Sequence, residues 1–277
     1  MLATNLPTPG VLNLANPANL QAPLNRGCLG WWLTLPNRVR NSEWKPIIGK
    51  DVGVMNNMDP VTDWAFTPVR PGGWGCFDTD GTNDYIEIPF TGFNNATNAS
   101  LAVWIYKVSS ASNSHTVGGN DGDADRFGME WFGSTFYFTG RAAFPSVAKS
   151  VTGWHHVVLT YGTGSPTQVA YMDGVNMNLT GGTDSGPLNS GVDVLRLGRN
   201  AATSGVYGTG RHDDLRAYNR TLSATEARQL YWASRGGYQN ELNWIRRPMP
   251  FKPAAAGLPV SNSMRGGFVN MCGGFVN

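Results

Sequence analysis

The amino-acid sequence predicts an all-β protein, a two-sheet antiparallel sandwich, and three observations support this. Glycine makes up 35 of the 277 residues, and glycine is a residue of tight turns. Only 14% of the residues are charged, too few for a bundle of amphipathic helices. Apolar or alternating segments recur about every 8–12 residues with turn residues between them, which is typical of a sandwich or jelly roll.

Composition divides the chain into three zones. Residues 1–26 form a proline- and asparagine-rich arm, residues 27–235 carry the strand pattern, and residues 236–277 form a second arm that ends in a repeated Gly-Gly-Phe-Val-Asn pentamer. Both arms either stay disordered or become ordered when a neighbouring subunit covers their apolar groups. The predicted subunit contacts in the second arm are Trp244, Phe251, Phe268 and Phe275.

The strands of the central zone are predicted from alternation and from β-branched and aromatic runs. They cover residues 84–89, 100–106, 126–131, 135–139, 155–161, 167–172, 175–179, 194–198 and 213–218. Asp173-Gly174 lies between two of them and is the strongest hairpin signal in the chain. Phe132-Gly133-Ser134 predicts a second hairpin.

One short helix is predicted near the end of the central zone. Ser223 followed by Glu226 three residues later forms a capping box. Ala227 and Leu230 then share one face of the helix, and Gly236 ends it.

Several motifs, in order, resemble those of the laminin-G-like (LamG) domains with a concanavalin A-like jelly roll, in their bacterial and viral form. They cover residues 77–86, 102–106, 153–161, 171–174, and 195–199 together with 212–226. This resemblance extends over about residues 28–233 and leaves both arms outside it. It implies a jelly-roll sandwich that binds glycans or proteins, sometimes through calcium.

The acidic segment around residue 123 is a candidate calcium site. Asp121, Asp123 and Asp125 have the spacing that presents oxygen ligands to Ca²⁺. A polar turn between strands explains the same residues, because Asp bonds the backbone of turns. We favour the turn, so the sequence predicts no cofactor, with Ca²⁺ as the open alternative.

The sequence supplies no catalytic group, and we predict that the protein is not an enzyme. Glycoside hydrolases need a pair of carboxylates, but Glu130 and Glu87 each lack an acidic partner at i+2. His155 and His156 are adjacent in a strand and therefore point to opposite faces, so they cannot bind one metal ion together.

Aromatic side chains near turns are the candidate glycan contacts, because an aromatic ring stacks on the apolar face of a sugar. The predicted glycan-binding residues are Trp131, Phe136, Tyr137 and Tyr207.

Charge and targeting signals exclude further classes. A net charge of +2 argues against a nucleic-acid partner. The sequence contains no run of 18 apolar residues, so it predicts no membrane insertion. Residues 1–25 lack the pattern of a signal peptide. Cys28, Cys76 and Cys272 form either one disulfide with a spare thiol or three reduced thiols, and we favour the latter.

These observations predict a structural protein of an assembly, most simply a decoration or head-surface subunit of a phage capsid, made in the host cytoplasm and exposed on the virion. Its partners would be copies of itself or other virion subunits, held through both arms, and host surface glycans. The alternative is an extracellular glycan-binding lectin or adhesin module.

Overall fold

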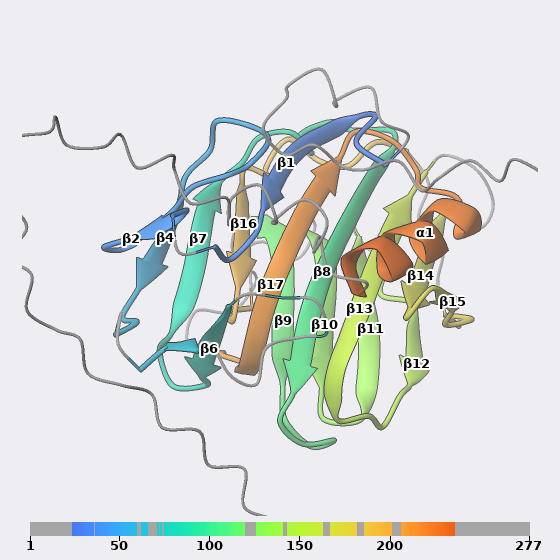
Figure 1. Ribbon diagram of the computed structural model, residues 1–277. Coiled ribbons are helices and arrows are strands. Elements are labelled where there is room, and N and C mark those ends of the chain that lie inside the picture. Colours follow the sequence, from blue (N-terminus) through green and yellow to red (C-terminus); the bar gives the residue numbers. More distant parts are fainter. Residues whose placement is uncertain are drawn as a thin grey trace, which may run out of the picture.

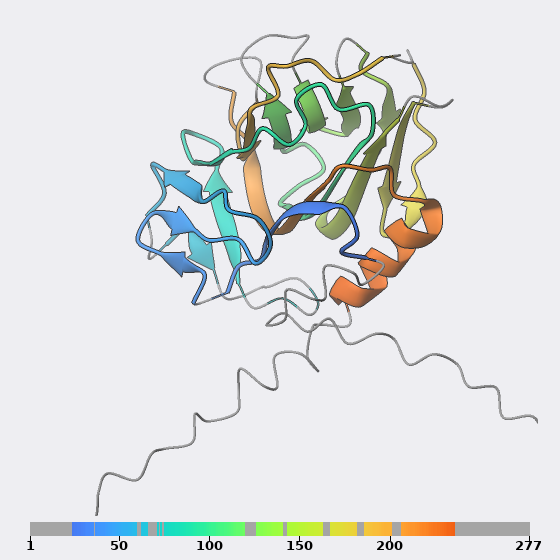
Figure 2. The ribbon, with the colours of Figure 1, turned by 90° about the horizontal axis from the view of Figure 1, so that it is seen from above.

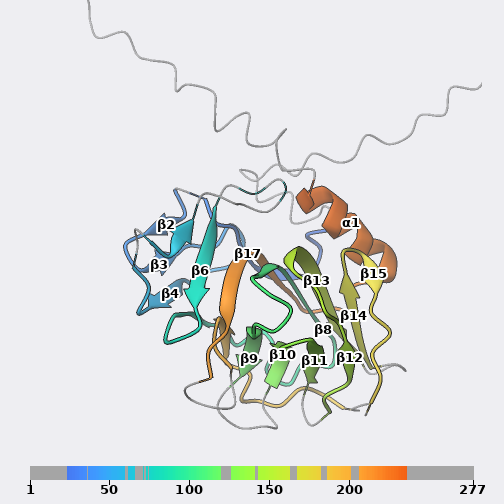
Figure 3. The same ribbon diagram turned by 90° about the horizontal axis from the view of Figure 1, so that it is seen from below.

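A computed structural model of the chain describes residues 24–35, 37–59, 62–65, 71, 73, 75–119, 126–140, 143–162, 167–181, 186–200 and 206–235. These residues form two antiparallel β-sheets packed face to face, with a helix on the outer side of one sheet (Figure 1). Viewed from below, the helix, the first sheet and the second sheet lie in successive layers (Figure 3). The predicted two-sheet sandwich is confirmed.

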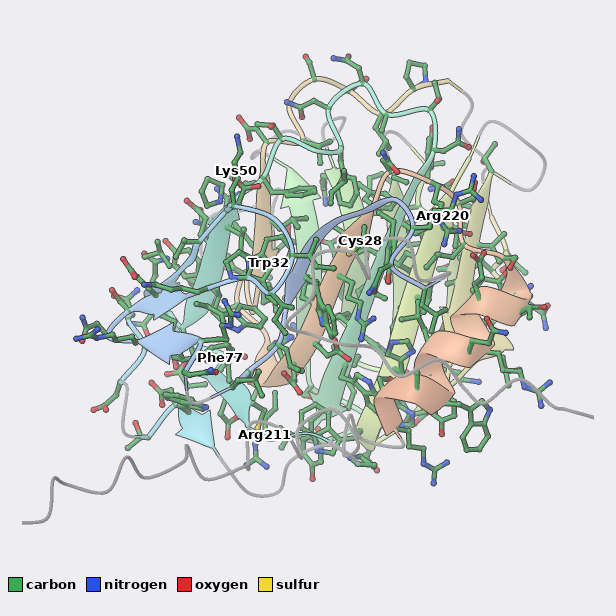
Figure 4. The ribbon with its side chains drawn as sticks, turned by 45° about the horizontal axis from the view of Figure 1, so that its top comes forward. Cys28, Trp32, Lys50, Phe77, Arg211 and Arg220 are labelled. Carbon is green, nitrogen blue, oxygen red and sulfur yellow. The ribbon has the colours of Figure 1, made fainter. Side chains whose placement is uncertain are left out.

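Sheet A is the sheet next to the helix. In spatial order its strands are β15 (Val175–Asn176), β14 (Gln168–Met172), β13 (Gly153–Tyr161), β8 (Ala99–Lys107), β17 (Thr209–Tyr218), β6 (Cys76–Asp80) and β5 (Trp64–Ala65). The long strand β17 pairs with β6 through its first half and with β1 (Cys28–Trp32) through its second half. Accordingly, Arg211 lies near the start of β17 and Cys28 lies beside its end (Figure 4).

Sheet B forms the other layer. In spatial order its strands are β12 (Ser146–Ala148), β11 (Thr135–Gly140), β10 (Arg126–Phe132), β9 (Ser114–Gly119), β16 (Val194–Leu197), β7 (Tyr85–Pro89), β4 (Gly53–Asn56), β3 (Glu43–Trp44) and β2 (Val39–Arg40).

The main core lies between the two sheets and is rich in aromatic rings. Alternate residues of β10, namely Phe127, Met129 and Trp131, are fully buried in it. Phe93 packs edge-to-face against Phe90 and Phe127, with ring centroids 4.9 and 4.7 Å apart. Such edge-to-face pairs add to the free energy gained by burying the rings.

The helix α1 (Ala224–Arg235) covers the outer face of sheet A (Figure 2). Ala227 and Leu230 pack there against Ala102 of β8 and Val158 of β13. The predicted capping box is confirmed, because the Glu226 amide donates to Ser223 Oγ and the Ser223 amide donates to Glu226 Oε2.

The Asp-Gly hairpin is confirmed between β14 and β15. Asp173 and Gly174 have φ of 53° and 78°, as a type I′ turn requires. The returning strand is shorter than predicted: it ends at Asn176, because Asn178 turns the backbone with a φ of 53°. The second predicted hairpin, between β10 and β11, is also confirmed.

Several predictions lie outside the described residues. The two arms do so apart from residues 24–26, which form a turn before β1, so the domain boundaries stay a prediction.

Cys28 is a free thiol, and burial raises its pKa to about 12. Within the described residues, no helix has the length and apolar composition needed to cross a membrane.

Candidate functional site

The outer face of sheet B, turned away from the core, carries a set of polar and aromatic side chains. On β10 the buried core residues alternate with Arg126, Gly128 and Glu130, which therefore face outward. Thr139 lies directly opposite Gly128, and Tyr137 lies opposite Glu130. Paired residues of antiparallel strands share a face, so these five positions lie together.

The same reasoning extends this face across the sheet. We use the name polar face for the outward residues of β11, β10, β9, β16 and β7, which are Tyr137, Thr139, Arg126, Gly128, Glu130, His115, Arg196, Glu87 and Tyr85.

An ion pair lies over a glycine at the centre of the polar face. Arg126 and Glu130 are four residues apart, about 13 Å in a strand, yet Arg126 Nη1 lies 3.4 Å from Glu130 Oε2. The two side chains therefore extend toward one another along the strand, above Gly128, which has no side chain in the way. Both are almost completely buried, at 8% and 4% side-chain exposure.

Burial dominates the electrostatics of this pair. It raises the pKa of Glu130, although Arg126 and a hydrogen bond with Asn200 lower it in part. Burial also lowers the pKa of Arg126, against the attraction of Glu130. The site thus holds two charges that are only partly compensated by each other.

Two polar atoms beside this pair have no hydrogen-bond partner among the described residues. They are Glu130 Oε1 and Thr139 Oγ1, and the two residues are 3% and 0% exposed. Buried polar atoms are nearly always hydrogen-bonded. A hydroxyl-bearing ligand or a water molecule would supply the missing partner.

A second ion pair and two tyrosines occupy the other half of the polar face. Arg196 Nε donates to Glu87 Oε2 at 2.8 Å. The Arg199 guanidinium lies over the ring of Tyr85 at 5.2 Å. The rings of Tyr85 and Tyr207 are 6.2 Å apart, so Tyr207 extends the polar face at its rim.

The predicted glycan-binding residues fall into two groups. Trp131 and Phe136 are fully buried in the core, so the prediction that their rings are exposed is wrong: alternation along β10 and β11 turns them inward. Tyr137 and Tyr207 are partly exposed at the polar face and stay predictions.

The other predicted site residues lie outside the described residues. These are Asp121, Asp123 and Asp125 for the metal, and Trp244, Phe251, Phe268 and Phe275 for subunit contacts. In the described part of the chain, no group of three or more His, Cys, Asp or Glu side chains is placed to hold a metal ion.

The two glutamates of the polar face lie apart from one another. Glu130 is on β10 and Glu87 on β7, three strands away in the sheet, so their Cα atoms are roughly 14 Å apart or more. Each of the two carboxylates is paired with an arginine.

Sequence reasoning missed the partner of Glu130. It treated Glu130 as isolated, whereas the structure pairs it with Arg126. The signal was present in Arg126-Phe-Gly128-Met-Glu130, because alternation places these three residues on one face with the glycine between the charges. Arg196 and Arg199 gave no comparable signal.

A family model described as the concanavalin A-like lectin/glucanases superfamily, Laminin_G_3, matches residues 80–228, more than half of the chain. Comparison with curated proteins finds no significant match.

Several solved structures share the fold at low sequence identity. Trypanosoma rangeli sialidase in complex with sialic acid is 16% identical, with a TM-score of 0.53 over 74% of this chain and 32% of that one. Botulinum neurotoxin type C, whose cell entry depends on interaction with two ganglioside molecules, is 10% identical, with a TM-score of 0.54 over 75% and 51%. The receptor-binding domain of a botulinum neurotoxin C/D mosaic is 10% identical, with a TM-score of 0.51 over 74% and 51%.

This chain thus spans only a third to a half of those chains, and the likeness concerns the fold. The ordered motifs, the two-sheet sandwich and the match over residues 80–228 agree: the chain belongs to the Laminin_G_3 family of the concanavalin A-like lectin/glucanases superfamily.

Proposed function

We propose that the protein is a non-enzymatic glycan-binding module that holds a saccharide on the polar face of sheet B. The observation that carries the proposal is a pair of buried atoms without a hydrogen-bond partner among the described residues, Glu130 Oε1 and Thr139 Oγ1, on neighbouring strands of the polar face. A carboxylate accepts hydrogen bonds and a hydroxyl both donates and accepts them. Together they match the hydroxyl groups of a sugar.

The surroundings of these atoms suit a sugar as well. Partly exposed rings stand on both sides, Tyr137 next to Glu130 and Tyr207 at the far rim. Aromatic rings stack on the apolar face of a sugar ring, while a few polar groups fix its orientation. The solved structures that share the fold include a sialidase with bound sialic acid and a neurotoxin that interacts with gangliosides, which supports glycans as the ligand class.

The test compares two threonines that differ only in the face they occupy. Thr139→Val removes the unpartnered hydroxyl of the polar face. Thr116→Val removes another buried, unpartnered hydroxyl, but one on β9 opposite the core residue Met129. Each change replaces an unsatisfied hydroxyl by a methyl group, so neither is expected to lower the free energy of unfolding.

We expect the wild type to bind a subset of glycans on an array. For the best of these, Thr139→Val weakens binding about fivefold or more in calorimetry, since one hydrogen bond is lost, and Thr116→Val leaves it unchanged. Equal affinities for the two variants, or no glycan bound by the wild type, would contradict the proposal.

A further inference from the structure

We propose that the saccharide bound by this protein is acidic and that Arg199 binds its carboxylate. This inference rests on the proposed glycan-binding function and adds the charge class of the ligand. Its basis is the position of Arg199 and its ion pairing, which differs from that of Arg126 and Arg196 on the same face.

Arg199 contacts the ring of one tyrosine and the backbone of another. Its guanidinium lies 5.2 Å from the ring centre of Tyr85, and its backbone pairs with that of Tyr207 in an isolated β-bridge. The rings of Tyr85 and Tyr207 lie 6.2 Å apart. A guanidinium stacked on a tyrosine is already oriented, so its planar edge loses less freedom when it binds a carboxylate.

Arg199 has no acceptor for its guanidinium among the described residues. Its Nε atom is buried and has no hydrogen-bond partner. Arg126 and Arg196, in contrast, are each paired with a glutamate, at 3.4 and 2.8 Å. Since a buried donor without a partner is costly, the arrangement favours a ligand that brings an acceptor to this point.

The charges of the polar face favour an anion over a neutral acceptor. Glu130 and Glu87 are paired with Arg126 and Arg196, so among the described residues of the polar face no carboxylate is paired with Arg199. Guanidinium and carboxylate form two parallel hydrogen bonds, about twice as strong as neutral ones. Tyr207 is placed beside Arg199 to contact the ring of the same sugar residue.

The experiment uses two acidic saccharides, sialyllactose and an oligogalacturonate, each compared with its own methyl ester, in which the carboxylates are neutral. Affinities are measured by calorimetry for the full chain. We expect at least one acidic member to bind about tenfold or more tightly than its neutral partner, and this preference to shrink as salt concentration rises.

Arg199→Gln removes the charge and Arg199→Lys keeps it without the planar edge. We expect Arg199→Gln to abolish the acid preference while any binding of the neutral partner persists, and Arg199→Lys to restore part of it. Arg228→Gln, at an exposed position of α1, is the control and leaves the preference unchanged. Unfolding curves of all variants verify that they are folded.

The outcomes separate this inference from the function on which it rests. Wild-type protein that binds acidic and neutral partners equally, or an Arg199→Gln variant that keeps the acid preference, overturns the role of Arg199 and leaves glycan binding intact. Absence of binding to every saccharide, both in these pairs and on the array, overturns both.

Discussion

At the scale of single residues, Asp214 of β17 links two neighbouring strands, because it bonds Trp31 of β1 and forms a buried ion pair with Arg216 of β17. Asp214 Oδ1 accepts hydrogen bonds from Trp31 Nε1 at 2.6 Å and from Arg216 Nε at 3.1 Å. Asp214 and Arg216 are each 1% exposed, and the Arg216 guanidinium lies 4.0 Å from the ring centre of Trp31. Removal of one partner from such a pair leaves an uncompensated buried charge.

We therefore expect Asp214→Asn to lower the free energy of unfolding by about 3–5 kcal/mol, measured by urea denaturation. Asp214 has a φ of 53°, a conformation that Asn also tolerates, so the substitution changes the charge and not the backbone. Asp173→Asn is the control: its φ is also 53°, but its ion-pair partner His155 is partly exposed, and we expect a loss below about 1 kcal/mol. Equal losses at the two positions would show that charge burial is not the cause.

At the scale of elements, local sequence signals predicted the features that a few neighbouring residues determine. The Asp173-Gly174 turn and the Ser223–Glu226 capping box are examples. The strand β9 (Ser114–Gly119) was not predicted, because a segment of small and polar residues has no clear β pattern. It is ordered by its partners, β10 on one side and β16 on the other.

The candidate site was harder to predict from sequence for a related reason. Proximity to a turn suggested that Trp131 and Phe136 are exposed, whereas the pleat decides which face each residue takes. Arg199 and Tyr85 are 114 residues apart in the sequence but stack in the fold. Only the order and register of the strands bring such residues together.

The capping box of α1 gives a prediction at this scale. Ser223→Ala removes the oxygen that accepts the Glu226 amide hydrogen, so we expect a loss of about 1 kcal/mol in the free energy of unfolding. Thr225→Ala changes an exposed residue of the same first turn outside the box, and it should be neutral or slightly stabilising because Ala favours helix. A Ser223→Ala loss no larger than that of Thr225→Ala would exclude a contribution from the cap. Thermal and urea unfolding both measure the change in the free energy of unfolding of each variant.

At the scale of the whole molecule, assembly through the two arms remains a prediction. The arms carry the predicted contacts Trp244, Phe251, Phe268 and Phe275, which lie outside the described residues. A virion role and calcium at Asp121, Asp123 and Asp125 remain predictions for the same reason. A mass measurement of the purified protein in solution decides the first point, since a stable isolated monomer contradicts assembly through the arms.

Two buried histidines, one facing the core and one on the polar face, give the whole fold a further property, its response to acid. His212 of β17 faces the core beside Ile105 and Phe77, and His115 lies on β9. Both side chains are completely buried, and neither ring nitrogen of either one has a hydrogen-bond partner among the described residues. Burial lowers the pKa of His115 to about 4 and that of His212 to about 3, and each is lowered further by a nearby cation, Lys107 for His115 and His115 for His212.

Both histidines therefore destabilise the fold as the pH falls below about 6.5, because their imidazole rings take up protons in the unfolded chain and stay neutral in the folded chain. Each histidine lowers the free energy of unfolding by up to about 1.4 kcal/mol for every pH unit of this fall. Asp84, whose pKa burial raises to about 6, acts in the opposite sense and offsets part of the loss.

We expect His212→Leu to make the decline in the free energy of unfolding between pH 6.5 and 4 shallower, as measured by urea denaturation at a series of pH values. At pH 8 the variant should be at least as stable as the wild type, because an apolar side chain replaces an unsatisfied one. An unchanged slope would mean that protonation of His212 is not what couples acid to unfolding.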